Sequence, residues 1–375
     1  MRTESFFKGF GREHARAIEL MRKGLLKEEN GNVVPDDVKE ELVARGLAYK
    51  QKGKLLIDPE YGYFLGIDIG GTSAKSMLID FGFKAVAGSF RSEDRGSEIN
   101  VFKHNLERAL DGTMGSANPR RILGIGIALP GTVDPSHGKV LFTTNVQFLS
   151  GLRAIELLPR KFASAWADLP MKLEHDCKAA VLAEKLAGGP GHTERKESSI
   201  VAVTVGTGVS AGSYVNGSVI RGATNAAGEF GHIMVNGFDG RQCGCGKVGC
   251  LEAEASGSAM QAKWLERTGT KATVVEIAEA AMDGNIDAIE LFKETGRWLG
   301  LGLSYIVNLM EPELITLYGG VSAAYDLFSE SLNETLSKHA WPLANWKVER
   351  SMIGSEIVGL GAALVAYEHI LGSAT

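Results

Sequence analysis

The chain has 375 residues, of which 44% are hydrophobic and 23% are charged, and its formal net charge is −5. This composition predicts a globular protein of two or three domains. A weakly acidic chain has no overall attraction for nucleic acid or anionic membranes, and no apolar run approaches the ~20 residues of a membrane-spanning helix. The first residues lack the apolar core of a signal peptide, so we expect a cytoplasmic protein.

Residues 1–62 are charged and poor in glycine, unlike the rest of the chain. Their pattern predicts one helix over 12–24, a second over 35–46 and a hairpin over 47–57. Two helices and a hairpin suggest the remnant of a winged-helix module. The segment has 12 Lys and Arg against 11 Asp and Glu, a net charge of +1, and shows no third, recognition helix. DNA is therefore an unlikely partner.

From residue 63 onwards, strands alternate with glycine-rich turns, and one arrangement occurs twice. A strand, a turn and a second strand are expected at 64–68, 69–75 and 76–80, and again at 200–205, 206–212 and 213–215. Helices are expected at 101–111, 177–187, 256–266, 271–283, 286–308, 322–338 and 355–371. The repeat predicts two α/β lobes that face each other across a cleft. The small lobe would span 63–178, completed by the C-terminal helix 355–372, and the large lobe 179–354.

Both repeated turns have the composition of phosphate-binding loops, because small residues let successive backbone N–H groups converge on anionic oxygens. Each turn alone could equally be an ordinary hairpin turn, and neither matches a P-loop or a dinucleotide-binding fingerprint. A third glycine feature, Gly319-Gly320, follows the strand 314–317. It suits close approach of an adenosine, or it simply connects a strand to a helix.

Three of the chain's 4 cysteines lie close to a histidine in the segment 232–250. The four residues His232, Cys243, Cys245 and Cys250 form a Cys3His set, the number and type of ligands in a closed tetrahedral zinc site. The alternatives are buried cysteines in a turn or a disulfide, although Cys243 and Cys245 are too close together to bridge easily. We therefore predict a structural Zn2+.

Asp176 ends a strand over 171–175 and begins the helix 177–187. Asp is favoured as a capping residue, which is one interpretation of this position. Because strand ends in α/β lobes face the cleft, Asp176 could also be the general base that deprotonates a substrate hydroxyl. The neighbouring Cys177 is expected to be a small, buried helix residue.

Several segments together resemble the ROK family, which contains bacterial sugar kinases and sugar-responsive repressors. They are residues 65–72, 206–212, 227–232 and 243–252, with support from 124–131, Asp134 and Asn145. The resemblance covers about residues 63–370. It implies an α/β fold of two actin-like (ribonuclease H-like) lobes around a central cleft, here with a small N-terminal winged-helix-like remnant.

The resemblance also implies an activity: ATP-dependent phosphorylation of a hydroxyl on a hexose or N-acetylhexosamine, with Asp176 as the general base. The implied cofactors are ATP, Mg2+ and structural Zn2+. The implied ATP-binding residues are Asp68, Gly70, Gly71, Thr72, Lys75, Gly206, Thr207, Gly208, Gly319 and Gly320. The implied sugar-binding residues are Asn145, His175, Glu229, His232 and Glu252, with His232 also a zinc ligand. Family members are commonly dimers or tetramers, so we expect a homo-oligomer.

The chain departs from the family pattern in two places. The usual Glu-Asn-Asp reads Glu174-His175-Asp176, so the histidine could change which sugar is bound or weaken catalysis. The usual Asp-Pro before the adenosine strand is Glu311-Pro312, a difference that we expect to be harmless. Residues 38–59 resemble the end of the winged-helix module of ROK repressors. Because the segment from Asp68 to Thr72 matches the ATP-binding pattern of the family without change, we expect a kinase, with a sugar-sensing regulator as the alternative.

Overall fold

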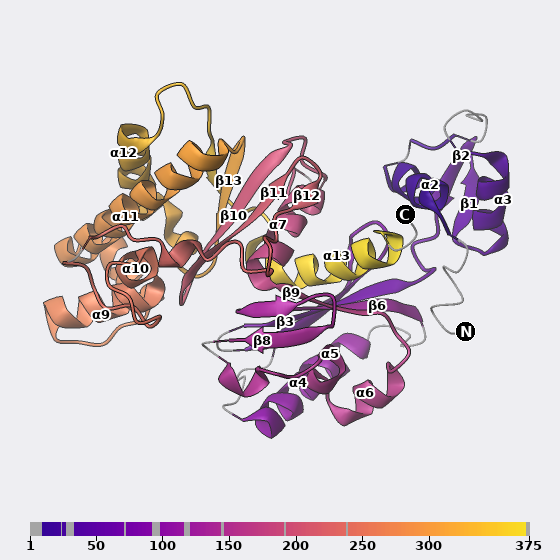
Figure 1. Ribbon diagram of the computed structural model, residues 1–375, viewed down its shortest axis with the longest axis horizontal. Helices are drawn as coiled ribbons and strands as arrows, with labels where there is room; N and C mark the ends of the chain where they lie inside the picture. The colour runs from indigo at the N-terminus through magenta and orange to yellow at the C-terminus, as the bar shows by residue number, and fades with distance from the viewer. Residues whose placement is uncertain are drawn as a thin grey trace. The chain divides into compact units, whose positions relative to one another are not determined.

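The computed structural model describes residues 10–23, 25–27, 34–70, 73–91, 98–115, 121–143, 146–190, 193–237 and 239–372. The chain forms two compact units. Unit 1 consists of Met1–Ala179 and Val358–Thr375, and unit 2 of Ala180–Ile357. Each unit has its own five-stranded sheet (Figure 1). Among the described residues, no helix is long and apolar enough to cross a membrane.

The sheet of unit 1 has the strand order β5-β4-β3-β6-β9. Its strands are β3 (Tyr63–Ile69), β4 (Ala74–Ile79), β5 (Ala85–Arg91), β6 (Ile122–Leu129) and β9 (Met171–His175). Strand β3 pairs antiparallel with β4, whereas β3, β6 and β9 are parallel. The register aligns Asp68 with Ala128 and Ala128 with Glu174. The carboxyl ends of β3, β6 and β9 therefore lie at one edge of the sheet.

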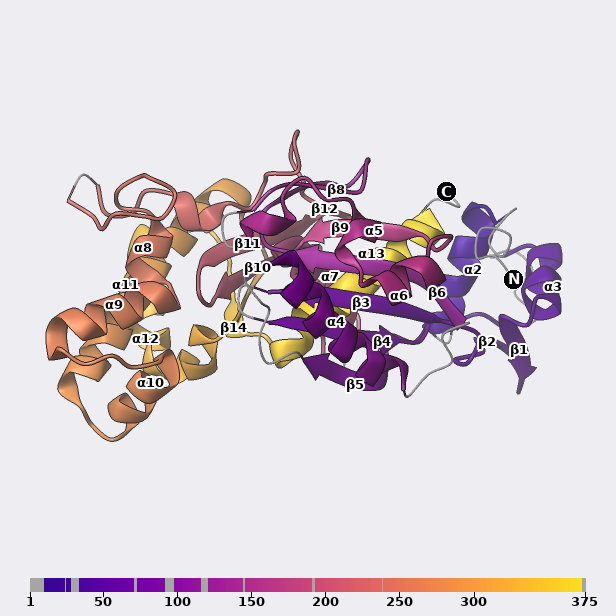
Figure 2. The same ribbon diagram turned by 90° about the horizontal axis from the view of Figure 1, so that it is seen from below.

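Helices cover both faces of this sheet (Figures 1 and 2). They are α4 (Ile99–Met114), α5 (Ala154–Leu157) and α6 (Arg160–Ala165) on one side and α13 (Ile357–Gly372) on the other. Helix α13 lies directly on the strands. A Cβ at Gly66 would be 2.0 Å from the Gly359 oxygen, and a Cβ at Gly126 would be 1.7 Å from the Ala362 oxygen. Glycine is therefore required at both strand positions for this close contact.

The N-terminal module, residues 10–62, belongs to unit 1. It consists of α2 (Arg12–Arg22), α3 (Asp36–Ala44), β1 (Ala48–Gln51) and β2 (Lys54–Ile57), the two helices and hairpin that the sequence predicts. Lys52 and Gly53 both have positive φ, 48° and 71°, which suits a two-residue hairpin turn. The Arg22 guanidinium lies 4.4 Å from the ring centre of Phe83, so α2 packs on the turn after β4.

The sheet of unit 2 has the order β12-β11-β10-β13-β14. Its strands are β10 (Ser199–Val205), β11 (Val209–Val215), β12 (Ser218–Val219), β13 (Leu314–Tyr318) and β14 (Val348–Arg350). Strands β12, β11 and β10 are antiparallel and β10, β13 and β14 are parallel, which is the same pairing pattern as in unit 1. The internal repeat and the two-lobed α/β fold predicted from the sequence are confirmed.

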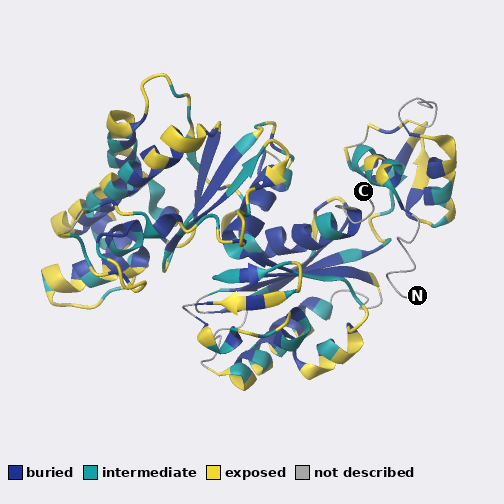
Figure 3. Cartoon of the chain, viewed as in Figure 1, coloured by how far each residue is buried: buried dark blue, intermediate teal, exposed yellow. Residues whose placement is uncertain are grey.

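Helices surround a buried core in unit 2, as the dark interior of Figure 3 shows. They are α8 (Leu251–Ala255), α9 (Gly257–Thr268), α10 (Val274–Met282), α11 (Ile286–Met310) and α12 (Ser329–His339), with 3-10 helices η3 (Phe230–His232) and η4 (Val321–Leu327). Helix α7 (Asp176–Ala187) begins in unit 1 and continues into unit 2.

Two sequence-based boundaries differ most from those of the structure. The expected helix 322–338 is divided into η4 and α12, because Phe328 between them has φ −130° and is fully buried. The second turn is shorter than the expected 206–212, since Val205 already pairs with Val209 across it. The turn is therefore Gly206–Gly208, and β11 begins four residues earlier than the strand expected at 213–215.

Candidate active site and metal centre

The carboxyl edge of the unit 1 sheet holds the first group of expected site residues. Asp68 is buried near the end of β3 and lies opposite Lys75 of β4 in the antiparallel register. The turn between them begins at Gly70, whose N–H donates to the Ser73 oxygen at 2.9 Å. Three further expected residues, Gly71, Thr72 and Asn145, lie outside the described residues.

His175 and Asp176 lie at the same edge, where β9 meets α7. Asp176 is the first residue of α7. Its Oδ1 accepts from the Cys177 N–H at 2.7 Å, whereas a conventional capping side chain accepts from an N–H two or three residues further on. The His175 Nδ1 lies 3.0 Å from the same Oδ1. Cys177 is fully buried in α7. At the junction of β9 and α7, an imidazole nitrogen therefore lies directly beside the expected base.

The two glycine turns of unit 2 lie next to each other at the carboxyl edge of its sheet. Strands β10 and β13 are parallel neighbours, with Thr204 paired to Tyr318, so the turns that follow them share one edge. Gly319 has φ 100°, and a Cβ there would lie 2.7 Å from the Val205 oxygen. A Cβ at Gly206 would lie 3.9 Å from the Gly320 nitrogen. Backbone N–H groups of this kind at strand ends suit an anionic ligand.

The expected sugar-binding residues of unit 2 lie beside the Gly206–Gly208 turn. Glu252, in the first turn of α8, accepts from the Val209 N–H at 3.0 Å, and a Cβ at Gly208 would be 2.4 Å from its Oε2. Glu229 precedes η3 and is exposed. Its Oε2 lies 3.8 Å from the His232 Nε2. Glu252 thus holds the glycine turn in place, while Glu229 and His232 form a polar pair.

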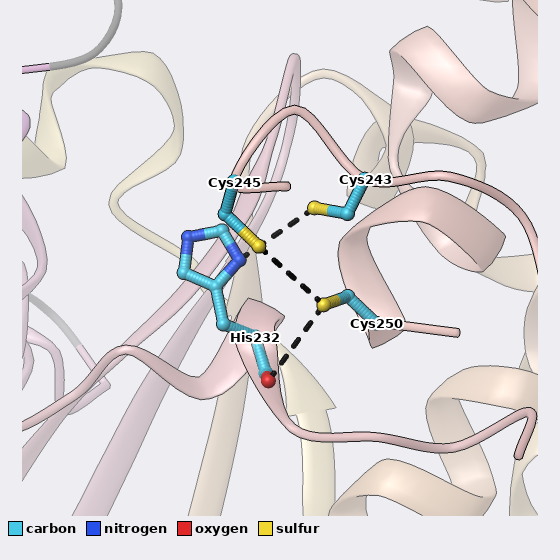
Figure 4. Close-up of side chains that lie close together, drawn as sticks. All are labelled: His232, Cys243, Cys245 and Cys250. Atoms are coloured by element: carbon cyan, nitrogen blue, oxygen red, sulfur yellow. Dashed lines mark hydrogen bonds between the residues drawn. The ribbon is translucent and has the colours of Figure 1, made fainter. Parts of the chain in front are cut away.

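The four expected zinc ligands converge, as Figure 4 shows. Their ligand atoms all lie within 4.8 Å of one another. The Cys245 and Cys250 sulfurs are 3.7 Å apart, and the Cys243 sulfur is 3.7 Å from the His232 Nδ1. All four cysteines are free, and these distances far exceed a disulfide bond of about 2.05 Å. The disulfide interpretation is therefore wrong.

These distances fit a tetrahedral zinc site. Zn–S bonds of about 2.3 Å and Zn–N bonds of about 2.05 Å place tetrahedral ligand atoms roughly 3.6–3.8 Å apart. The loop is shaped for it, since the Gly246 N–H donates to the Cys243 oxygen at 3.0 Å and Gly246 has φ 89°. Burial and the neighbouring sulfurs raise the pKa of Cys250 to about 12. A bound cation would reverse that effect, because a coordinated thiol is deprotonated.

Sequence reasoning missed a buried ion pair that supports this loop. Glu254 accepts from the Asn236 side chain at 2.8 Å and from the Arg241 N–H at 3.0 Å through Oε1, and from Lys263 at 3.1 Å through Oε2. The Lys263 ammonium also reaches Glu294 at 2.6 Å. The sequence contains one sign of this ion pair: Glu254 is the second carboxylate of the segment Leu251-Glu252-Ala253-Glu254, which directly follows the last cysteine.

The ROK family model matches residues 64–367. The xylose repressor of Caldicellulosiruptor bescii is 28% identical over 365 residues, covering 91% of this chain and 88% of the repressor. The solved structure of a ROK family glucokinase from Streptomyces griseus, in complex with glucose and AMPPNP, is 27% identical with a TM-score of 0.69, covering 82% of this chain and 100% of that chain. A ROK family transcriptional regulator, a homologue of the E. coli MLC protein, shares the fold over 96% of both chains, with 22% identity and a TM-score of 0.78. Because the family model spans most of the chain, this protein belongs to the ROK family.

Proposed function

We propose that the protein is an ATP-dependent kinase that phosphorylates a hydroxyl group of a hexose or N-acetylhexosamine. The observation that carries the proposal is the position of two carboxylates in unit 1. Asp68 near the end of β3 and Asp176 directly after β9 lie at the carboxyl edge of one parallel sheet. The likeness to the Streptomyces griseus glucokinase supports the same activity.

In the proposed reaction, Asp176 accepts the proton of the sugar hydroxyl as the hydroxyl oxygen attacks the terminal phosphorus of ATP. The bond from that phosphorus to the bridging oxygen breaks, and ADP leaves with its electrons. Asp68 is the residue of unit 1 that would hold Mg2+, since its carboxylate is buried at the same edge and oxygen is the ligand that Mg2+ prefers. When bound, Mg2+ neutralises charge on the phosphates.

We assign the remaining contacts to the residues implied by the family. The turns Gly206–Gly208 and Gly319–Gly320 would bind ATP through backbone N–H groups, and their adjacency at one sheet edge supports this assignment. Glu229, His232 and Glu252 would bind the sugar, together with Asn145, because carboxylates and an imidazole provide oriented acceptors and donors for a ring of hydroxyls.

We further propose that His232 and the three neighbouring cysteines hold one structural Zn2+. The spacing of the sulfur and nitrogen atoms supports this assignment. The His232 Nδ1 lies 3.7 Å from the Cys243 sulfur, and its Nε2 lies 3.8 Å from the Glu229 Oε2. Metal binding would thus fix the His232 side chain and, through Cys250, the start of helix α8, which carries Glu252.

The test is ADP release with ATP and Mg2+ over a panel of hexoses, N-acetylhexosamines and xylose. We expect one sugar or a small related group to stand out in kcat/KM. Asp176→Asn should lower kcat by roughly 10^2–10^4-fold, the range for loss of a general base, and leave sugar affinity within about tenfold. A protein that binds sugar but releases no ADP with any sugar in the panel is not a kinase.

A second candidate function is a sugar-sensing regulator of transcription. It is favoured by the match to a xylose repressor, which covers 91% of this chain, whereas the family model covers only residues 64–367. Its test is binding of the full chain to genomic DNA fragments, with and without sugar. We expect only weak, salt-sensitive binding, because the exposed positions of α3 include Asp36, Asp37 and Glu40. Tight, sequence-specific binding that a sugar relieves would establish the regulator instead.

A further inference from the structure

We propose that the outer face of helix α11 binds a second copy of this chain. The contact is an apolar patch made of Tyr305, Leu309, Trp341 and Leu343, named the α11 patch below. These residues are 39%, 84%, 66% and 82% exposed. Single exposed apolar residues are normal on a protein surface, whereas a continuous group marks a contact with another molecule. The inference concerns unit 2 alone and does not depend on the proposed kinase function.

The second half of α11 has the composition of a helix that is buried on every side. Residues 298–310 contain no charged residue, and a helix that is apolar all round is normally covered all round. Two of its faces are covered within unit 2. A Cβ at Gly300 would lie 2.3 Å from the Leu332 oxygen of α12, and a Cβ at Gly302 would lie 2.7 Å from the Leu251 side chain of α8. The remaining face is exposed.

The exposed face of α11 continues into the loop after α12. Residues three and four apart are neighbours on a helix, so Tyr305, Asn308 and Leu309 lie on one face. The Asn308 Nδ2 donates to the His339 oxygen at 3.0 Å, and the Asn308 Oδ1 accepts from the Trp341 N–H at 2.7 Å. One polar side chain on the exposed face therefore fixes Trp341 beside the helix.

A tight turn presents the last member of the patch. The Ala344 N–H donates to the Trp341 oxygen at 2.9 Å, which closes a four-residue turn with Leu343 at a central position. The end of α11 and this loop are both coloured as exposed in Figure 3. The helix and the loop thus form one apolar surface that is held in place by hydrogen bonds.

The area of the patch fits a two-fold contact between copies. Its four residues expose roughly 600 Å², which is as large as the largest apolar patch of a typical monomer. Covering the patch on both copies would remove about 1,200 Å² from water, the lower end of the range for stable interfaces. Tryptophan and tyrosine at the centre and the absence of charge are also typical of an interface core.

The charges at the two ends of the apolar segment favour an antiparallel arrangement. Arg297 directly precedes residues 298–310 and Glu311 directly follows them, and both are exposed. In a two-fold contact each copy presents the same surface to the other. If the two α11 helices lie antiparallel, Arg297 of each copy approaches Glu311 of the other copy. Opposite charges at the rim of an interface fix its register and orientation.

A second group of exposed apolar residues lacks these properties and provides the control. Met282 and Ile286 are 68% and 81% exposed near the start of α11. Each is followed directly by an exposed carboxylate, Asp283 and Asp287. A two-fold contact there would bring like charges together, which opposes binding. We therefore expect self-association through the end of α11 and not through its start.

The first test is sedimentation equilibrium of the full chain, without ATP or sugar, over a wide range of concentration. We expect a dimer or a larger assembly built from this dimer. Leu309→Lys/Leu343→Lys should raise the dissociation constant of the α11 contact by at least about 10^2-fold, because the contact buries each new charge on both copies. The matched control is Ile286→Lys, at an equally exposed position of the same helix, which should change nothing. Melting temperatures show that each variant is folded.

The second test locates the contact. The chain has 5 tryptophans, so the Trp341 signal is read as the difference between the wild type and Trp341→Phe. Acrylamide quenching of this signal should fall as the chain associates. A wild-type chain that stays monomeric in the micromolar range overturns the proposal. Association that persists unchanged in Leu309→Lys/Leu343→Lys, or that leaves Trp341 quenching unchanged, also overturns it.

Discussion

Loss of one partner of the buried Glu254–Lys263 ion pair is expected to destabilise unit 2 strongly. Its side chains are 3% and 7% exposed, so both charges are removed from water. Replacing one partner of a buried pair costs about 3–5 kcal/mol, because the other charge stays buried. Glu254→Met leaves Lys263 in contact with Glu294 at 2.6 Å, which places the expected loss of unfolding free energy at the lower end, about 3 kcal/mol.

The assay is thermal unfolding followed by calorimetry, with attention to the transition of unit 2. For a domain of about 150–250 residues, 1 kcal/mol corresponds to about 2–4 °C, so Glu254→Met should lower Tm by about 6–12 °C. The matched control is Glu290→Met, which breaks an ion pair to Arg297 whose side chains are about half exposed and should cost less than about 1 kcal/mol. A Tm for Glu254→Met no lower than that of the control would refute the reasoning.

Two further measurements, a double variant and the pH dependence of Tm, test whether the effect comes from the paired charges. The double variant Glu254→Met/Lys263→Met removes both charges and should lose clearly less than the sum of the single variants. Burial raises the pKa of Glu254, but the Arg241 N–H, Asn236 and Lys263 outweigh burial and hold the pKa below its ordinary value. A depressed pKa contributes stability above the ordinary value of about 4.3, which is lost as the pH falls through the folded pKa. The difference in Tm should therefore shrink below about pH 4.

Three other changes have distinct expected outcomes. Cys243→Ser should lower both zinc content and Tm, whereas Cys177→Ser, outside the cluster, should keep the metal; elemental analysis of protein purified without chelator decides this. Gly126→Ala should destabilise by about 1–3 kcal/mol in denaturant unfolding, because its Cβ would meet the Ala362 oxygen at 1.7 Å. Deleting residues 1–62 should lower the Tm of unit 1, since α2 packs on it, but leave sugar phosphorylation measurable; complete loss of activity in a folded product would contradict this.

The repeated lobe could be predicted from the sequence because strand and turn signals are local. Apolar runs interrupted by Gly/Thr turns mark β3, β4, β10 and β11 whatever surrounds them. Boundaries set by distant contacts could not be predicted in this way. Val209 begins β11 directly after Gly208, and its N–H bonds to Glu252, 43 residues further along the chain. Phe328 interrupts a continuous helical pattern because the core of unit 2 buries it completely.

The grouping of His232 with three cysteines and the position of Asp176 could also be predicted from the sequence, because residue spacing and the order of strand and helix can be read from it. The side-chain contacts of these residues could not be predicted from the sequence. His175 could be recognised as a departure from the family, but only the corner between β9 and α7 shows its Nδ1 beside the base. Glu254 was visible as one carboxylate in an acidic run. Its burial depends on Lys263, which reaches it from the next helix, α9.

The N-terminal module holds part of its positive charge in internal contacts. A DNA-binding module needs accessible cations for phosphate contacts. Here the Arg22 and Arg45 guanidinium groups lie 4.4 Å and 4.8 Å from the ring centres of Phe83 and Phe10. Lys39, on α3, is buried and pairs with Asp36 at 2.8 Å. These three cations stabilise the packing of the module within unit 1. The hairpin lysines Lys50, Lys52 and Lys54 are exposed instead, so the DNA-binding test of the full chain bears on them rather than on the three cations that serve the packing.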